Sequence, residues 1–189
     1  MKPCASCPFQ PTAPPGLWHP AHYLEIAYLG SVESFTEPRD LATIMLCHKT
    51  SLTPSSRHAV PPLVCGGWVH AAPNSFRVRA AYLRGRICGD EPEPLPLLSP
   101  EQMMLQNGFD MSQLPPLRWS PEDTRYPSYS AWVDAVAALR TQLREDPEYA
   151  WHFVLPDSPL ERGPTPETVE AALGKPGLRR YAQQLRRGL

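Results

Sequence analysis

The chain has 189 residues, a net charge of −1 and an apolar content of 42%, which suffices for one folded domain with a hydrophobic core. No stretch approaches the ~20 apolar residues of a membrane-spanning helix, and the N-terminus lacks the apolar run of a secretory signal. The sequence therefore does not predict an integral membrane protein. We expect a cytoplasmic protein without a membrane partner.

Proline and charge are unevenly used along the chain. Proline accounts for 25 residues, well above the average usage of roughly 5%, so we expect short regular elements and long irregular segments. Residues 1–87 carry a net charge of +4, residues 88–170 of −10 and residues 171–189 of +5. The acidic middle is either ordinary solvated surface or a region that orients two basic, anion-binding ends.

The N-terminal half is predicted to alternate loops with short elements. Five prolines and no sustained hydrophobic period predict a loop over residues 1–19. Apolar spacing predicts a helix over residues 20–29 that Gly30 ends, and the compact apolar run of residues 41–49 predicts a strand. A turn over residues 63–72 follows, in which two glycines allow unusual backbone angles.

A linker is predicted to divide the chain. Residues 88–100 are rich in proline and acidic residues, so we expect a cysteine-rich metal-binding domain over residues 1–87 and a helical region over residues 88–189. A helix over residues 75–86 is predicted just before this linker. Its inward-facing residues are predicted to be Phe76, Ala80 and Leu83, with Arg77 and Arg84 facing outward.

The helix that follows the linker has clear start and stop signals. Ser99 is predicted to be its N-cap, Pro100 its first residue and Gly108 its end. Residues 109–127 contain four prolines and no regular period, which predicts an irregular segment.

The longest helix is predicted over residues 128–145, because its apolar residues recur every three or four positions. Two short helices, beginning near Thr165 and Leu178 and separated by a break from Gly174 to Gly177, are expected to close the chain. Together, the elements expected along the chain predict a mainly α fold with a small irregular or β element. Its N-terminal half is expected to be metal-stapled and its C-terminal half helical. The core stripe of the longest helix is predicted to be Trp132, Val136, Leu139 and Leu143.

Four of the five cysteines lie within the first 65 residues, with the spacing C-x2-C-x39-C-x17-C. The C-x2-C pair lets two thiolates bind one ion from a single turn, and two ligands from separate elements complete a tetrahedron. A four-sulfur site leaves no open coordination position for a catalytic water, which favours a structural or electronic role. The predicted metal ligands are Cys4, Cys7, Cys47 and Cys65.

The spacing leaves the bound group open. Zinc is the first choice and a 4Fe–4S cluster the alternative, since Pro8 follows a cysteine as in ferredoxin-type sequences. A redox dithiol formed by Cys4 and Cys7, or a set of independent cysteines, is also compatible with the pattern. His48 is interpreted as an alternative ligand, a hydrogen-bond donor to the sulfurs or a surface residue, and Cys88 as a thiol outside the set.

Four segments carry a resemblance to a known family. They are CASCPF, GLWHPAHYLEIAYL, IMLCHKT and LVCGGWV, and they occur in this order within residues 3–87. In order and motif they resemble an uncharacterised family of small cysteine-rich proteins from actinobacteria and their phages. The resemblance implies that the four predicted ligands and His48 form one unit. Gln10 departs from the pattern, where arginine is usual, so no anion-binding role is implied there.

The C-terminal tail predicts a basic amphipathic helix. Arg179 and Arg180 recur seven residues later as Arg186 and Arg187, which places both pairs on one side. Docking of the helix on the core of the same chain, with its arginines solvated, is the first interpretation, and these arginines are also candidates for binding an anion or a partner. A sequence pI near 6.6 argues against strong non-specific binding of nucleic acid.

No nucleotide-binding, metalloprotease or serine-hydrolase motif is present in the sequence, so the interpretation leans away from an enzyme. We expect a metal-containing binding or regulatory protein, phage-encoded and acting on a host protein or on nucleic-acid machinery. The alternatives are an iron–sulfur protein with redox or enzymatic activity and a nucleic-acid-binding module that uses the basic ends. No sequence feature specifies an oligomeric state.

Overall fold

The computed structural model describes residues 3, 6–31, 64–71, 76–83, 85, 87 and 95–186. Its helices are α1 (Pro20–Ser31), α4 (Gly66–Ala71), α5 (Phe76–Leu83), α6 (Pro100–Asn107), α7 (Tyr129–Glu145), η1 (Pro147–Phe153), α8 (Pro159–Arg162) and α9 (Pro166–Arg186). The described residues form no sheet, although an isolated antiparallel bridge joins Phe109 and Val154. The expected mainly α fold is therefore confirmed for this part of the chain, and the strand predicted over residues 41–49 lies outside it.

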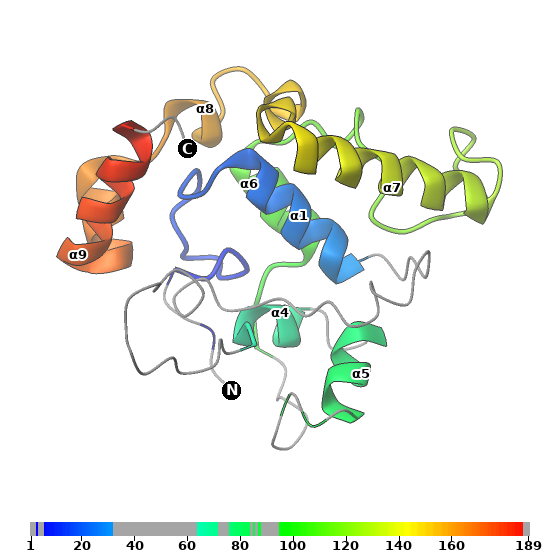
Figure 1. Ribbon diagram of the computed structural model, residues 1–189, viewed down its shortest axis with the longest axis horizontal. Coiled ribbons are helices and arrows are strands. Elements are labelled where there is room, and N and C mark those ends of the chain that lie inside the picture. The colour runs from blue at the N-terminus through cyan, green and yellow to red at the C-terminus, as the bar shows by residue number, and fades with distance from the viewer. Residues whose placement is uncertain are drawn as a thin grey trace.

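Helix α1 lies in the middle of the helical part and contacts α6, η1 and α7 (Figure 1). Its exposed side carries His22 and Glu25, and the helix ends at Ser31, past the end predicted at residue 29. Burying a large apolar side chain contributes roughly 1.5–3 kcal/mol, so this helix anchors the core. Its buried residues are those that the apolar spacing predicts, namely Tyr23, Leu24, Ile26, Ala27 and Tyr28.

Helix α6 begins and ends at the predicted residues. The Ser99 hydroxyl accepts a hydrogen bond from the Gln102 backbone N–H at 3.1 Å, and the Gln102 side chain accepts one from the Ser99 N–H at 2.8 Å. This reciprocal pair satisfies backbone donors that the first turn leaves without helical partners. Gly108 follows with φ 89°, a left-handed conformation that glycine adopts without strain.

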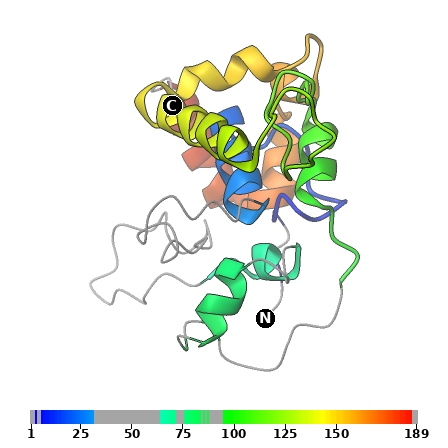
Figure 2. The same cartoon turned by 90° about the vertical axis from the view of Figure 1, so that its right-hand side faces the viewer.

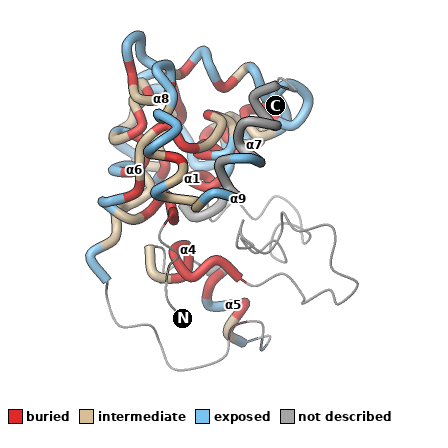
Figure 3. Tube along the Cα trace, turned by 90° about the vertical axis from the view of Figure 1, so that its left-hand side faces the viewer, coloured by how far each residue is buried: buried red, intermediate tan, exposed pale blue. Residues whose placement is uncertain are grey.

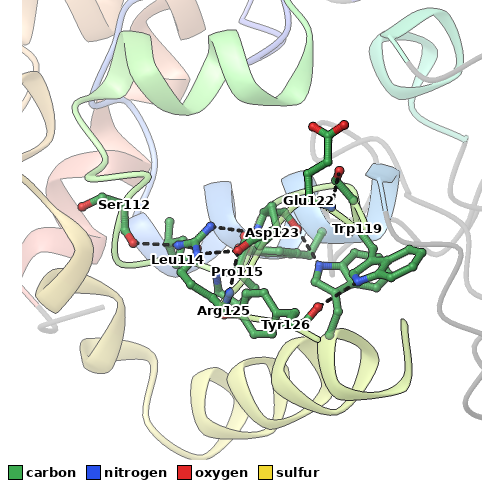
Figure 4. Close-up of polar contacts among 12 residues, drawn as sticks. Ser112, Leu114, Pro115, Trp119, Glu122, Asp123, Arg125 and Tyr126 are labelled. Atoms are coloured by element: carbon green, nitrogen blue, oxygen red, sulfur yellow. Dashed lines mark hydrogen bonds and ion pairs between the residues drawn. The ribbon is translucent and has the colours of Figure 1, made fainter. Parts of the chain in front are cut away.

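The irregular segment between α6 and α7 is held by side-chain hydrogen bonds (Figure 4). Arg125 donates to the Ser112 carbonyl oxygen at 2.9 Å and to the Asp123 carboxylate at 2.9 Å, and the hydrogen bond from Arg125 lowers the pKa of Asp123. The Tyr28 hydroxyl donates to the Pro115 carbonyl oxygen, and burial raises the pKa of Tyr28 far above its ordinary value. Tyr28 therefore ties α1 to this segment as a neutral phenol.

Helix α7 confirms the predicted long helix and its core stripe. The Ser128 hydroxyl accepts a hydrogen bond from the Ala131 N–H at 3.1 Å and so caps the first turn. Helix α9 is interrupted at Gly174 (φ 72°, ψ 172°), where the predicted break begins, and the chain is helical again ahead of the predicted restart at Leu178. No helix in the described ranges is both long and apolar enough to cross a bilayer. The buried residues of α7 are Trp132, Val133, Val136, Leu139 and Leu143.

Helices α4 and α5 lie together at one end of the molecule, away from α7 and η1 (Figures 1 and 2). In α5 the prediction for Leu83 is wrong, because this side chain is 90% exposed. Ala80 is buried as predicted, and Val78 and Ala81 are buried with it. The predictions for Phe76, Arg77 and Arg84 fall on side chains outside the described set. Leu83 follows Arg79 by four residues and therefore shares the exposed side of the helix with it.

Candidate metal centre

The segment after the first cysteine pair forms a tight turn that fixes Cys7. The Gln10 N–H donates to the Cys7 carbonyl oxygen at 2.9 Å, which places Pro8 at the second position of a four-residue turn, where its fixed φ is favourable. Cys7 and Phe9 are both fully buried. The Phe9 carbonyl oxygen accepts a hydrogen bond from the Leu98 N–H at 2.7 Å, so this turn is also held by the segment that precedes α6.

Cys65 lies at the start of α4. Its carbonyl oxygen accepts the first helical hydrogen bond, from the Val69 N–H at 3.1 Å, so Cys65 occupies the N-cap position of the helix. Its side chain is 3% exposed. The turn predicted over residues 63–72 is therefore corrected to a short helix that follows Cys65 directly, and this helix is buried along most of its length (Figure 3).

Cys7 packs against the first turn of α4 at Gly67. A Cβ atom added to Gly67 would lie 1.9 Å from the Cys7 Sγ and 3.4 Å from the Phe9 ring, and contacts under 3.0 Å are essentially never seen for real Cβ atoms. The sulfur thus occupies the space that any other side chain would need. Gly67 has no positive φ, so glycine is required here for room, and the predicted role in an unusual backbone angle is wrong.

Two predicted ligands that are 58 positions apart in the sequence therefore lie at the same turn. Cys7 touches Gly67, and Cys65 precedes Gly67 by two residues. Both are buried as thiols within the same hydrophobic cluster, together with Phe9 and Trp68. A pair of buried sulfurs in apolar surroundings suits a soft metal, because thiolate ligands select zinc and iron–sulfur clusters over hard cations.

Trp68 adds an unexpected polar group to this cluster. Its side chain is fully buried, yet its indole N–H has no hydrogen-bond partner among the described residues. Within the described part of the chain it is the one buried side-chain nitrogen or oxygen in that condition. A buried donor without an acceptor lowers the stability of the fold by about 1–3 kcal/mol. Such a donor is therefore unusual in a native core.

The remaining predicted site residues are not placed. Cys4, Cys47, His48 and Cys88 lie outside the described residues, and among the described residues no group of three or more histidine, cysteine or acidic side chains could hold a metal ion. The four-cysteine ligand set therefore stays a prediction. Of the four tail arginines, Arg179 is described and its side chain is exposed. Arg180, Arg186 and Arg187 have side chains outside the described set.

Comparison with known proteins gives a family but no activity. The sequence profile of DUF6283, a family of unknown function, matches residues 1–119, which is more than half of the chain. The chain belongs to DUF6283. The match extends beyond residue 87, past the predicted linker and through α6 into the segment that Arg125 holds. No curated protein and no solved structure matches the chain.

The extent of the DUF6283 match agrees with contacts in the structure. The turn at Phe9 receives a hydrogen bond from Leu98, and α1 contacts α6. Gln106 in α6 also donates to the Pro11 carbonyl oxygen at 3.3 Å. The N-terminal segment thus packs on residues beyond position 87, which makes the stretch matched by the family a connected structural unit.

Sequence reasoning identified the cysteines but missed two residues beside them. The signal for both was present in the triplet Gly66-Gly67-Trp68 that follows Cys65. Glycine in a buried helix signals a close approach by another part of the chain, and buried tryptophan ordinarily finds an acceptor for its N–H.

Proposed function

We propose that the chain is a metal-containing binding or regulatory protein whose N-terminal part is organised around a thiolate-bound metal centre. Cys7 and Cys65 would supply two ligands from the described residues, and Cys4 and Cys47 would complete the set. The metal would cross-link the N-terminal turn to α4 and to the segment that carries Cys47. With four sulfur ligands it would act structurally or electronically, since no coordination position remains for a substrate.

The observation that carries this proposal is the packing of the Cys7 Sγ into the space left by Gly67, two residues from Cys65. A glycine that leaves room for a sulfur at the start of a helix brings the two cysteines to one place. Helix α4 has six residues and is too short to be stable by itself, because isolated helices under about 12 residues are marginal in water. Metal binding would supply cohesion that such a short element lacks.

Zinc remains our first choice for the bound ion, and an iron–sulfur protein with redox activity is the second candidate. The second candidate is favoured by the indole N–H of Trp68, which lacks an acceptor among the described residues. A zinc ion brings no acceptor atom of its own, whereas a cluster brings inorganic sulfides.

The binding partner is inferred from chemistry on the surface and from the family resemblance. A protein partner is our first choice, in keeping with a phage or actinobacterial protein that acts on host machinery. Nucleic acid is the alternative, supported by the exposed Arg179 in the basic tail. Catalysis is not part of the proposal.

Metal content of a cysteine variant tests the proposal. The untagged full-length chain is expected to contain about one zinc per chain, and Cys65→Ser is expected to lose most of it because serine is a poor ligand for zinc. The matched control is Cys88→Ser, which removes the cysteine outside the predicted set and should retain the metal. Elemental analysis of zinc and iron, made beside far-ultraviolet circular dichroism, checks both variants.

Two results would overturn the proposal. One is a wild-type chain that binds neither zinc nor iron after anaerobic purification. The other is equal metal content in Cys65→Ser and Cys88→Ser while both retain their helical signal. A brown sample that absorbs broadly near ~400 nm would support the iron–sulfur candidate over zinc.

A further inference from the structure

The indole N–H of Trp68 is the polar group in the described core whose hydrogen bond is missing. The side chain is fully buried, and among the residues that the structure describes no acceptor lies within hydrogen-bond reach of its Nε1 atom. Leaving such a donor unpaired costs about as much stability as a substantial core truncation. No acceptor for this donor is present in the described part of the chain, so an acceptor supplied by a bound group would complete its hydrogen bonding.

Two other tryptophans show how this chain ordinarily satisfies an indole N–H. Trp119 donates to the Tyr126 carbonyl oxygen at 3.1 Å, and Trp132 donates to the Pro116 carbonyl oxygen at 2.8 Å. Both indole N–H groups thus donate hydrogen bonds to backbone carbonyl oxygens of the irregular segment between α6 and α7. Trp68 differs from them in lying on α4, beside the two described cysteines.

The position of Trp68 relates it directly to those cysteines. It lies in the first turn of α4, three residues after Cys65, the residue that caps this helix. It also follows Gly67, the residue against which the Cys7 Sγ packs. Cys7 packs on Gly67 and Cys65 directly precedes α4, so a centre bound by the two sulfurs lies at the first turn of α4, which also carries Trp68.

We propose that the Trp68 indole N–H donates a hydrogen bond to a sulfur atom of the bound metal centre. The inference rests on the metal-containing function proposed above and deepens it by assigning a residue that tunes the centre. The acceptor is either a cysteine thiolate on zinc, brought within reach when the metal gathers its ligands, or an inorganic sulfide of an iron–sulfur cluster. Hydrogen bonds to such sulfurs orient the ligands and set the electronic properties of the centre.

The hydrogen bond can be observed directly when the centre holds a single ion. In the ¹¹³Cd-substituted full-length chain, a hydrogen bond to a cadmium-bound thiolate is expected to give a proton–cadmium correlation to an indole proton. Trp68→Phe should remove this correlation and leave the cadmium content unchanged. Trp119→Phe is the matched control and should leave the correlation in place, because the N–H of Trp119 is bonded to Tyr126.

If the centre is an iron–sulfur cluster, the readout is its reduction potential. Trp68→Phe should shift the potential to a more negative value with unchanged iron content, because loss of a donor to sulfide destabilises the reduced, more negatively charged cluster. Trp119→Phe should not shift it. In the wild-type chain, a hyperfine coupling between the reduced cluster and an exchangeable proton, absent in Trp68→Phe, would identify the donor without reliance on the potential.

The outcomes separate the two proposals. A chain that binds neither cadmium nor iron overturns the metal-containing function and this inference with it. A chain that binds metal, but in which Trp68→Phe changes neither the cadmium correlation nor the cluster potential and hyperfine signal, overturns this inference alone. A cadmium correlation identifies a thiolate acceptor on a single ion, whereas the potential shift together with the hyperfine signal identifies a sulfur acceptor of a cluster, either a sulfide or a cysteine thiolate.

Discussion

Gly67→Ala is expected to abolish most metal binding and to unfold the end of the molecule that carries α4. The added Cβ would lie 1.9 Å from the Cys7 Sγ, so the sulfur must leave its position beside Cys65. Replacing glycine by alanine in a helix ordinarily stabilises by about 1 kcal/mol. Overpacking a closed core costs about 1–3 kcal/mol, and the loss of a metal ligand adds to that cost. Metal analysis and denaturant unfolding measure the two effects.

A double variant provides the control for this prediction. Cys7→Ala removes the sulfur that the new Cβ would meet, so Gly67→Ala should destabilise the chain far less in the Cys7→Ala background than in the wild type. Neither the single nor the double Cys7 variant is expected to hold a full complement of metal. If Gly67→Ala is equally destabilising in both backgrounds, or if it retains metal as the wild type does, the packing of Cys7 on α4 is not as described.

Gly108→Ala is expected to lower the stability of the helical part of the chain by about 2–5 kcal/mol. Two costs add at this position. Gly108 has φ 89°, where an L side chain is strained by about 1–2 kcal/mol. A Cβ atom there would also lie 2.4 Å from the Cβ of Ser158, which caps α8, and relieving that overlap costs about 1–3 kcal/mol.

Gly85→Ala separates these two costs. Gly85 also has a positive φ, of 65°, but an added Cβ would meet nothing within 4 Å. Its replacement should therefore cost the backbone strain alone, about 1–2 kcal/mol. Chemical denaturation of the two variants measures the difference. Equal losses would mean that the close contact between the end of α6 and Ser158 contributes nothing.

Local signals explain which helices were predictable. Helix α6 begins with a serine followed by proline, and the same pairing of a capping residue with proline begins η1 at Asp146, α8 at Ser158 and α9 at Thr165. Proline is favourable at the first helical position, where its missing N–H costs nothing. The abundance of proline therefore marks helix starts as well as loops. A capping residue followed by proline also marks the starts of η1 and α8. The sequence-based prediction nevertheless contains neither element.

The errors arose where tertiary packing decides the outcome. In α4, two successive glycines have poor helix propensity, and burial of the segment against Cys7 and Phe9 overrides it. In α5, the hydrophobicity of Leu83 suggested an inward position, but the register set by Val78 and Ala81 turns it outward. In α5, unlike in α1 and α7, the apolar pattern does not specify which face meets the rest of the fold.

In the candidate site, the cysteines were predictable from their spacing, whereas the roles of the residues beside them depend on tertiary packing. The spacing of the cysteines predicts a shared centre from ligand chemistry alone, and for Cys7 and Cys65 the structure places both at one turn. The roles of Gly67 and Trp68 depend on which segment approaches α4. That segment lies 60 residues away from Gly67 at Cys7, so the contact follows from the fold and not from the neighbouring sequence.

X-ray absorption spectroscopy of the full-length chain, recorded at the edge of the metal it contains, is the most direct test of the proposed centre. A zinc centre is predicted to give a first shell of four sulfur atoms at about 2.3 Å, and a cluster is predicted to give sulfur and iron neighbours at the iron edge. A first shell made up of oxygen or nitrogen atoms would contradict a centre built on Cys4, Cys7, Cys47 and Cys65.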